Sequence, residues 1–268
     1  MLVGFSVFCI FKLETLNKMS VEKISKPTAN LTAAAFIEKL STYQSNIELE
    51  KISRYFKTED GEYGEGDQFI GVRMGQVFEV ARAFVAMPIR EIEKLLESPF
   101  HEHRAGAVSI MDFRARDKKT SEDVKKALFE LYLNRHDRIN NWDLVDRAAC
   151  FVVGSYLFDK AKDILYQLAV SDNMWKRRTA MVSTSYFIRK GDLTDTFGIA
   201  EILLNDREDL IQKAVGGWIR QAGTKNKVQL MAFLEKHGAT MPRTMLRYAI
   251  EHFDKSDREY YLNLKKID

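Results

Sequence analysis

The sequence predicts an all-α protein in which pairs of helices stack along one axis into a solenoid. Its 268 residues are 46% hydrophobic and 29% charged, which is enough apolar material for a substantial core. Proline occurs only four times and never between Pro99 and Pro242, so helices are favoured over many short strands. From Leu31 onward, apolar residues recur at the spacing of amphipathic helices.

Residues 1–30 are expected to form an N-terminal extension. Residues 2–11 are mostly apolar, but so short a stretch cannot cross a bilayer, and no basic residue precedes it as in a signal peptide. Residues 1–18 are therefore either a loose tail or an upstream extension, because Met19 opens a polar segment typical of a cytosolic start. We expect a cytoplasmic protein with no membrane role.

Residues 31–268 are expected to form one repeat domain. Residues 31–86 are predicted to be a helical cap, which an acidic, glycine-rich loop at residues 58–67 separates from the repeats. Helix-pair repeats follow over residues 88–254, and a C-terminal helix over residues 255–268.

Turn signals divide the repeat region into five helix pairs. Polar turn residues and glycines lie between the apolar-periodic segments, and two prolines stand at helix starts. An apolar run at residues 149–158 could pass for a buried strand, but no turn signal precedes it, so we assign it to a helix. The pairs are expected at residues 88–117, 120–157, 160–190, 194–222 and 225–254. Their second helices are expected to line one wall, at the spacing of a two-helix solenoid repeat, and to begin near residues 100, 142, 173, 209 and 242.

The common enzyme and metal signatures are absent from the sequence. It has no P-loop, GxGxxG, GxSxG, HExxH or CxxC motif, so no cofactor is expected. Cys9 and Cys150 are the only cysteines, which excludes a disulfide framework and favours a reducing compartment. His101 and His103 flank Glu102, but residues two apart on a helix point in different directions, so no metal site is expected.

The segment NNWDLVD, residues 140–146, is the strongest candidate for chemistry. Asn141 is predicted to cap a helix, and Trp142 and Asp146, four residues apart, then share one face. An indole and a carboxylate presented together could hold a cation. The alternative is structural: Trp142 fills a gap between helices, while Asp146 pairs with Arg147 or Arg178.

Basic residues in the second half of the chain are candidates for binding a polyanion. The net charge is only +3, so charge alone does not indicate nucleic acid. On the helix IQKAVGGWIR, Lys213, Gly217 and Arg220 lie away from the apolar stripe, and a glycine between basic groups lets a phosphate chain approach closely. The alternative is a solvated helix face, and Trp218, within the stripe, is expected in the core.

Taken together, these segments resemble the DNA alkylation repair glycosylases of the AlkD type, which are built from HEAT-like repeats. The resemblance spans roughly residues 35–255, and it rests on the shared order and spacing of several segments. They are FIGVRMGQVFEVARAF (69–84), HEHRAGAVSIMDF (101–113), NNWDLVDRAA (140–149), SDNMWKRRTAMV (171–182), IQKAVGGWIRQAG (211–223) and MPRTMLRYAIEHF (241–253).

The resemblance implies a HEAT-like solenoid whose concave basic cleft wraps duplex DNA. It also implies that the enzyme removes N3- or N7-alkylated purines. Asp146 matches the essential carboxylate of the family and Trp142 an aromatic residue that faces the lesion. AlkD-type enzymes leave the lesion stacked, which fits an open groove, and the sequence carries no obvious pocket signal. The residues expected to contact DNA are Arg178, Lys213, Gly217, Arg220, Arg243 and Arg247.

One departure from the family falls at Gly217, where the family has a further aromatic residue. The neighbouring Trp218 is rotated by about 100° around the helix, so it is no direct substitute, and the activity itself is open to question. The expected partner is duplex DNA carrying alkylated purines, bound by a monomer. Two alternatives remain: a non-catalytic module that recognises damaged DNA or RNA, and a protein-binding scaffold.

Overall fold

A computed structural model describes residues 30–57 and 62–264, and all the regular structure in these ranges is helical. The expectations for the N-terminal extension and for Cys9 lie outside the described residues, as does part of the acidic loop. The N-terminal helices are α2 (Ala33–Ser41), α3 (Asn46–Tyr55) and α4 (Met74–Ala83). The repeat region contains α5 (Ile89–Leu96), α6 (His101–Arg116), α7 (Glu122–Asn134), α8 (Trp142–Ala148), α9 (Ser155–Leu157), α10 (Asp163–Ala169), α11 (Met174–Ser183), α12 (Ser185–Lys190), α13 (Thr194–Ile202), α14 (Asp209–Gly223), α15 (Lys227–His237) and α16 (Arg243–Ala249), and α17 (Lys255–Asn263) follows it.

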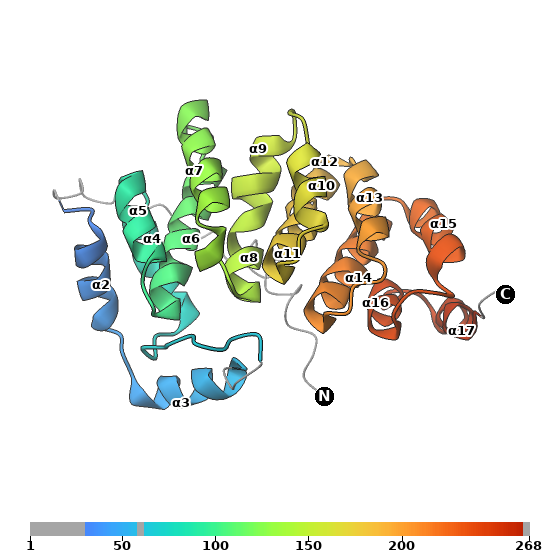
Figure 1. The fold of residues 1–268 in the computed structure, drawn as a ribbon, viewed down its shortest axis with the longest axis horizontal. Helices are drawn as coiled ribbons and strands as arrows, with labels where there is room; N and C mark the ends of the chain where they lie inside the picture. The colour runs from blue at the N-terminus through green and yellow to red at the C-terminus, as the bar shows by residue number, and fades with distance from the viewer. Residues whose placement is uncertain (1–29, 58–61, 265–268) are drawn as a thin grey trace.

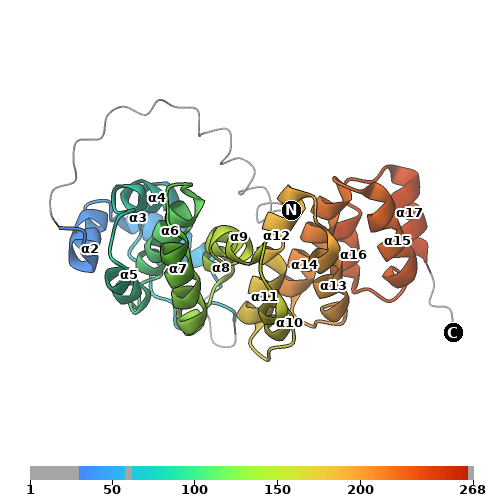
Figure 2. The same ribbon diagram turned by 90° about the horizontal axis from the view of Figure 1, so that it is seen from above.

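The helices stack side by side in two layers, which confirms the predicted helical-repeat solenoid (Figures 1 and 2). Helices α5, α7, α10 and α13 form one layer, and α4, α6, α14 and α16 belong to the other (Figure 2). In the second layer α6 contacts α8, α8 contacts α11, α11 contacts α14, and α14 contacts α16. The second helix of every predicted pair begins within one residue of its expected position.

The apolar run after Asp146 is helical, as predicted, but its winding differs from an α-helix. Residues Ala149–Gly154 form a π-helical turn, which continues α8 into α9. Gly154 brings this turn close to the next repeat, because a Cβ there would lie 2.1 Å from the backbone oxygen of Ser183. The turn therefore packs directly against the end of α11.

Helix α3 departs from the stack and runs crosswise to the second-layer helices at one end of them (Figure 1). The chain then returns through residues 62–73 to α4. This arrangement brings the end of α3 and the returning loop beside the start of α8. None of the helices in the described part of the chain is long and apolar enough to span a bilayer.

Candidate functional site

Helix α8 presents Trp142 and Asp146 on one face. Asn141 caps the helix as predicted: it is fully buried, and its side-chain oxygen accepts a 2.8 Å hydrogen bond from the backbone N–H of Trp142. The indole of Trp142 and the carboxylate of Asp146 line the same cavity. The structure thus brings together the two residues predicted to carry the chemistry.

The cavity has a volume of about 510 Å³ and lies among α3, α4, α6 and the start of α8. We expected an open groove without a pocket, and the structure differs because four helices that are distant in sequence assemble the wall. Most of the lining is hydrophobic, and charged groups interrupt it at a few points. The lining includes Tyr55, Phe56, Phe78, Arg116, Arg147 and Phe151.

Two aromatic rings at the end of α3 pack beside Trp142. The ring of Phe56 lies 6.1 Å from that of Trp142 at an interplanar angle of 24°, and the ring of Tyr55 lies 6.1 Å away at 64°. Tyr55 is 58% exposed, so an aromatic edge faces solvent next to the indole. The resulting surface suits a flat, electron-poor group.

Both oxygens of the Asp146 carboxylate bind one edge of a single guanidinium. Arg178 donates from Nε to Oδ1 of Asp146 over 2.9 Å and from Nη2 to Oδ2 over 2.8 Å. Its third nitrogen, Nη1, donates to the backbone oxygen of Leu210 over 2.6 Å, which fixes the guanidinium itself. The side chain of Arg178 is 3% exposed and that of Asp146 is 11% exposed. A fork of this kind sets the orientation of the carboxylate, and the DNA contact predicted for Arg178 stays a prediction.

Asp112 forms a second charged centre next to the cavity, because its two ion-pair partners, Arg116 and Arg147, line it. Its carboxylate is fully buried between Arg147, at 3.1 Å, and Arg116, at 2.8 Å. Burial raises the pKa of Asp112, and the two guanidinium groups oppose that rise. The guanidinium of Arg116 also lies 4.0 Å above the Phe151 ring. Because one carboxylate is shared by two guanidinium groups, this cluster carries an excess of positive charge.

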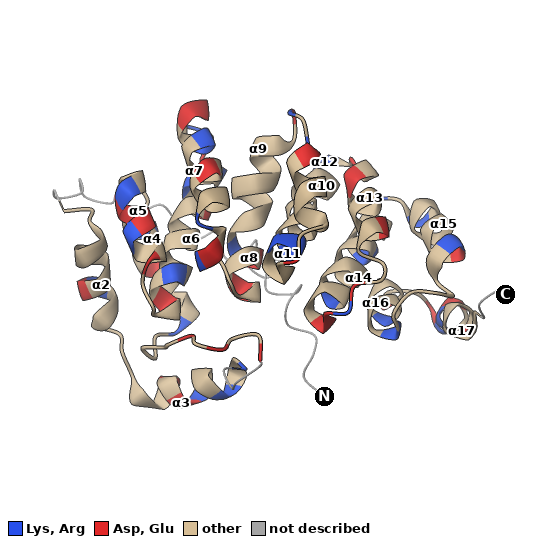
Figure 3. Cartoon of the chain, in the orientation of Figure 1, with Lys and Arg blue, Asp and Glu red and all other residues tan. Residues whose placement is uncertain are grey.

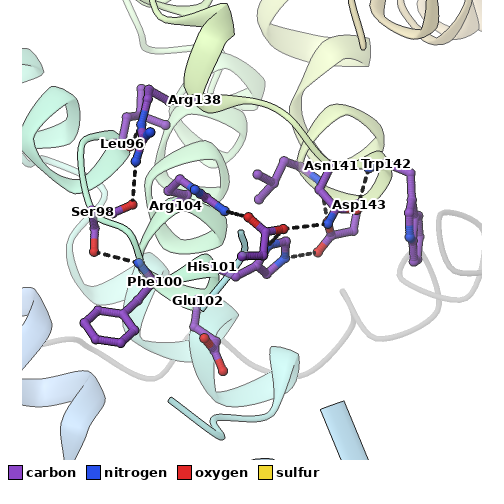
Figure 4. A network of polar contacts seen from close by, with 12 residues as sticks. Leu96, Ser98, Phe100, His101, Glu102, Arg104, Arg138, Asn141, Trp142 and Asp143 are labelled. Carbon is purple, nitrogen blue, oxygen red and sulfur yellow. Dashed lines mark hydrogen bonds and ion pairs between the residues drawn. The ribbon is translucent and has the colours of Figure 1, made fainter. Parts of the chain in front are cut away.

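A buried polar network joins the loop of residues 62–73 to the starts of α6 and α8 (Figure 4). The ring of His101 lies between two carboxylates, with Nε2 at 2.8 Å from Asp143 and Nδ1 at 3.4 Å from Asp67. Asp67 also pairs with Arg104 and accepts a 2.9 Å hydrogen bond from Asn141. Burial alone would lower the pKa of His101, but the two carboxylates outweigh it and raise that pKa to about 9.

Glu102 and His103, which follow His101 in the sequence, make hydrogen bonds that stabilise the same region. The carboxylate of Glu102 accepts hydrogen bonds from the backbone N–H groups of residues 70–72, and His103 pairs with Ser98 on another side of the helix. The two histidines therefore point in different directions, as predicted. Within residues 30–57 and 62–264, no three His, Cys, Asp or Glu side chains gather to form a metal site.

The basic residues predicted to meet DNA fall into two groups. Arg243 and Arg247 on α16 are exposed. Arg220 is buried against α16 and pairs with Glu251, while Lys213 is partly buried and pairs with Asp209 at 2.5 Å. Gly217 is buried between them on α14, and Trp218 lies in the core as predicted. The start of α14 is acidic and α16 carries only basic charges (Figure 3), and the basic cleft stays a prediction.

Sequence reasoning missed the residues that surround the Trp142 and Asp146 pair. Tyr55 and Phe56 precede the first segment that resembles the family. Asp67 was assigned only to a separating loop, and His101 was considered only as a metal ligand. The sequence gives no signal for this ion pair, because Asp67 and Asp143 are both distant from His101 along the chain.

Two comparisons with known proteins point to the same family. A model of the DNA alkylation repair enzyme family matches residues 36–253. A solved structure described as a predicted DNA alkylation repair enzyme from Enterococcus faecalis has a TM-score of 0.61 and 18% identity, covering 80% of this chain and 98% of that chain. At this identity the likeness concerns the fold. None of the curated proteins matches the chain.

Proposed function

Because the chain belongs to the DNA alkylation repair enzyme family, we propose that it is a DNA glycosylase that hydrolyses the N-glycosidic bond of cationic N3- or N7-alkylated purines in duplex DNA. The observation that carries this proposal is that the Asp146 carboxylate, held by Arg178, and the Trp142 indole line one cavity. The proposed enzyme acts as a cytoplasmic monomer and needs no cofactor.

The chemistry follows from the charge of the lesion. A purine alkylated at N3 or N7 carries a positive charge, so it leaves with the electron pair of the glycosidic bond and needs no general acid. Positive charge then develops on the sugar, and the carboxylate of Asp146 stabilises it electrostatically. Water adds to the anomeric carbon and gives up one proton to solvent, and in this proposal the carboxylate of Asp146 orients that water.

Arg178 and the rings beside Trp142 support this step in different ways. The bidentate contact of Arg178 holds the Asp146 carboxylate in one orientation, so no side-chain reorganisation is needed during reaction. The indole of Trp142 adds a surface that favours a cation. On α14 and α16, we propose that Lys213, Arg220, Arg243 and Arg247 contact the DNA backbone, with Gly217 allowing close approach.

A base-release assay on methylated duplex DNA tests the proposal. The wild type is expected to release 7-methylguanine or 3-methyladenine, and Asp146→Asn should lower the single-turnover rate by about 10²- to 10³-fold. The matched control is Asp206→Asn, because Asp206 also accepts two hydrogen bonds from one arginine, Arg177, but does not line the cavity. This control should keep the wild-type rate.

Two other results would point to the alternatives. Binding of methylated duplex without base release by the wild type would indicate a module that recognises damage without cutting. Absence of binding at low salt would indicate a protein-binding scaffold. An Asp206→Asn rate as low as that of Asp146→Asn would show that the loss reflects stability rather than chemistry.

A further inference from the structure

We propose that His101 is a positioning residue that clamps the first turn of α8 to the loop of residues 62–73, and so sets the orientation of Trp142 and Asp146 toward a bound nucleotide. This inference rests on the proposed function for its catalytic consequence. The clamp itself is a structural claim, and it has a readout that needs no substrate.

The hydrogen-bond chemistry of the ring indicates that His101 is an imidazolium. A neutral imidazole has one donor nitrogen and one acceptor nitrogen. Here Nε2 hydrogen-bonds to Asp143 over 2.8 Å, and Nδ1 lies 3.4 Å from an oxygen of Asp67, which is ion-pair distance rather than a hydrogen bond. A proton on each nitrogen makes both contacts attractive. The ring is fully buried, and the pKa of about 9 agrees with this assignment.

The charge of the surrounding cluster leads to the same conclusion. The side chains of Asp67 and Arg104 are 2% and 3% exposed, and that of Asp143 is 16% exposed. With a neutral His101, two carboxylates would face a single guanidinium in a buried space, whereas an imidazolium balances them. Arg138, on the 3₁₀ turn before α8, is a further cation near this group, but its guanidinium donates to the backbone oxygens of Leu96, Glu97 and Ser98 rather than to either carboxylate.

Three separate contacts connect the clamp to Trp142. The polar path runs through Asp143, which bonds to His101 and directly follows Trp142 in the first turn of α8. The aromatic path runs through Phe56, whose ring lies 4.8 Å from that of His101 and 6.1 Å from that of Trp142. Asn141 adds a third tie, since it caps α8 and donates to Asp67. A change at His101 therefore reaches the start of the helix that carries Asp146.

The first test follows Trp142 directly, in full-length protein labelled with 5-fluorotryptophan. The fluorine resonance of Trp142 is assigned by its loss in Trp142→Phe. His101→Gln should shift or broaden this resonance, and His103→Gln should leave it unchanged, because His103 is a buried neighbour that pairs with Ser98 instead. In the wild type the resonance should titrate with a midpoint near pH 9. His101→Arg keeps a cation between the carboxylates and should remove this titration.

The second test measures base release under single-turnover conditions. His101→Gln should lower the rate by up to about 100-fold, the loss expected from a misplacement of about 1 Å, with unchanged affinity for duplex DNA. His101→Arg should restore most of the rate. If His101→Gln does not fold, Asp67→Asn removes one carboxylate from the same clamp and should disturb the Trp142 resonance in its place.

The outcomes separate the clamp from the proposed function. If no base is released from any lesion, the proposed function fails, but the Trp142 resonance still decides whether the clamp exists. If base is released and His101→Gln keeps both the wild-type rate and the wild-type resonance, the clamp is overturned and the proposed function stands. An effect of His103→Gln equal to that of His101→Gln would also overturn the clamp.

Discussion

Charged residues are arranged differently around α8 and on α16. Around α8 the ionic groups are buried and bound to one another: the side chains of His101, Asp67 and Arg178 are 0%, 2% and 3% exposed. On α16, by contrast, Arg243 and Arg247 are exposed. Buried ion pairs in close contact favour a single arrangement, whereas exposed charges contribute little to the fold and stay available to a polyanion.

This difference indicates a division of labour along the solenoid. The region around α8 fixes the position of a few atoms, so a single change there should have a large and specific effect. The exposed arginines of α16 are proposed to supply contacts that add up along a DNA backbone, so each change there should have a small effect. The predictions below test this division in order of the expected effect.

The largest expected effect is a loss of stability at alkaline pH that originates at His101. Its pKa is about 9 in the folded chain and ordinarily about 6.5, so the folded state binds the proton more tightly. The stabilisation is complete below pH 6.5 and is lost as the pH rises toward 9. The free energy of unfolding should fall by about 3 kcal/mol over this range. Urea unfolding at pH 6.5, 7.5 and 9 measures it.

The other histidines do not interfere with this measurement. His103, His136, His237 and His252 all have lowered pKa values, with burial as the largest cause, so their effects on stability fall below pH 6.5. His101→Gln is the control, and it should flatten the dependence between pH 6.5 and 9. An equally steep loss of stability in this variant would assign the effect to another group.

How much could be predicted from the sequence depended on the range of the interactions. The cap at Asn141 and the common face of Trp142 and Asp146 were predicted because they involve residues at most four apart. The cavity was not, because its wall combines α3, α4, α6 and α8. The partner of Asp146 was left open between Arg147 and Arg178, since only tertiary packing brings α11 to α8, and the same limit concealed the contact of His101 with Asp143.

A smaller effect is expected at Gly217, where the resemblance to AlkD-type enzymes implies an aromatic residue. If α14 completes the site opposite Trp142, then Gly217→Trp should raise the rate of base release by up to about 10-fold, the value of one favourable aromatic contact. Gly216→Ala is the contrasting variant, because its Cβ would lie 2.4 Å from the backbone oxygen of Met245 and force α14 away from α16. It should lower stability without raising the rate. A Gly217→Trp protein that folds and is no faster would argue against a site shared between α8 and α14.

The smallest expected effect concerns single exposed charges on α16. Arg247→Gln should weaken binding of methylated and unmodified duplex equally, because a phosphate contact carries no information about the base. It should also reduce the slope of log affinity against log salt by about one, as expected for the loss of a single phosphate contact. The control variant is Lys126→Gln on α7, in the other layer of the solenoid. The Lys126 side chain is 60% exposed, and its Nζ lies 3.5 Å from a carboxylate oxygen of Glu130. Equal slopes for the two variants would place the DNA elsewhere. An effect of Arg247→Gln confined to methylated duplex would show that α16 takes part in recognising the lesion, and the division between the two regions would then fail.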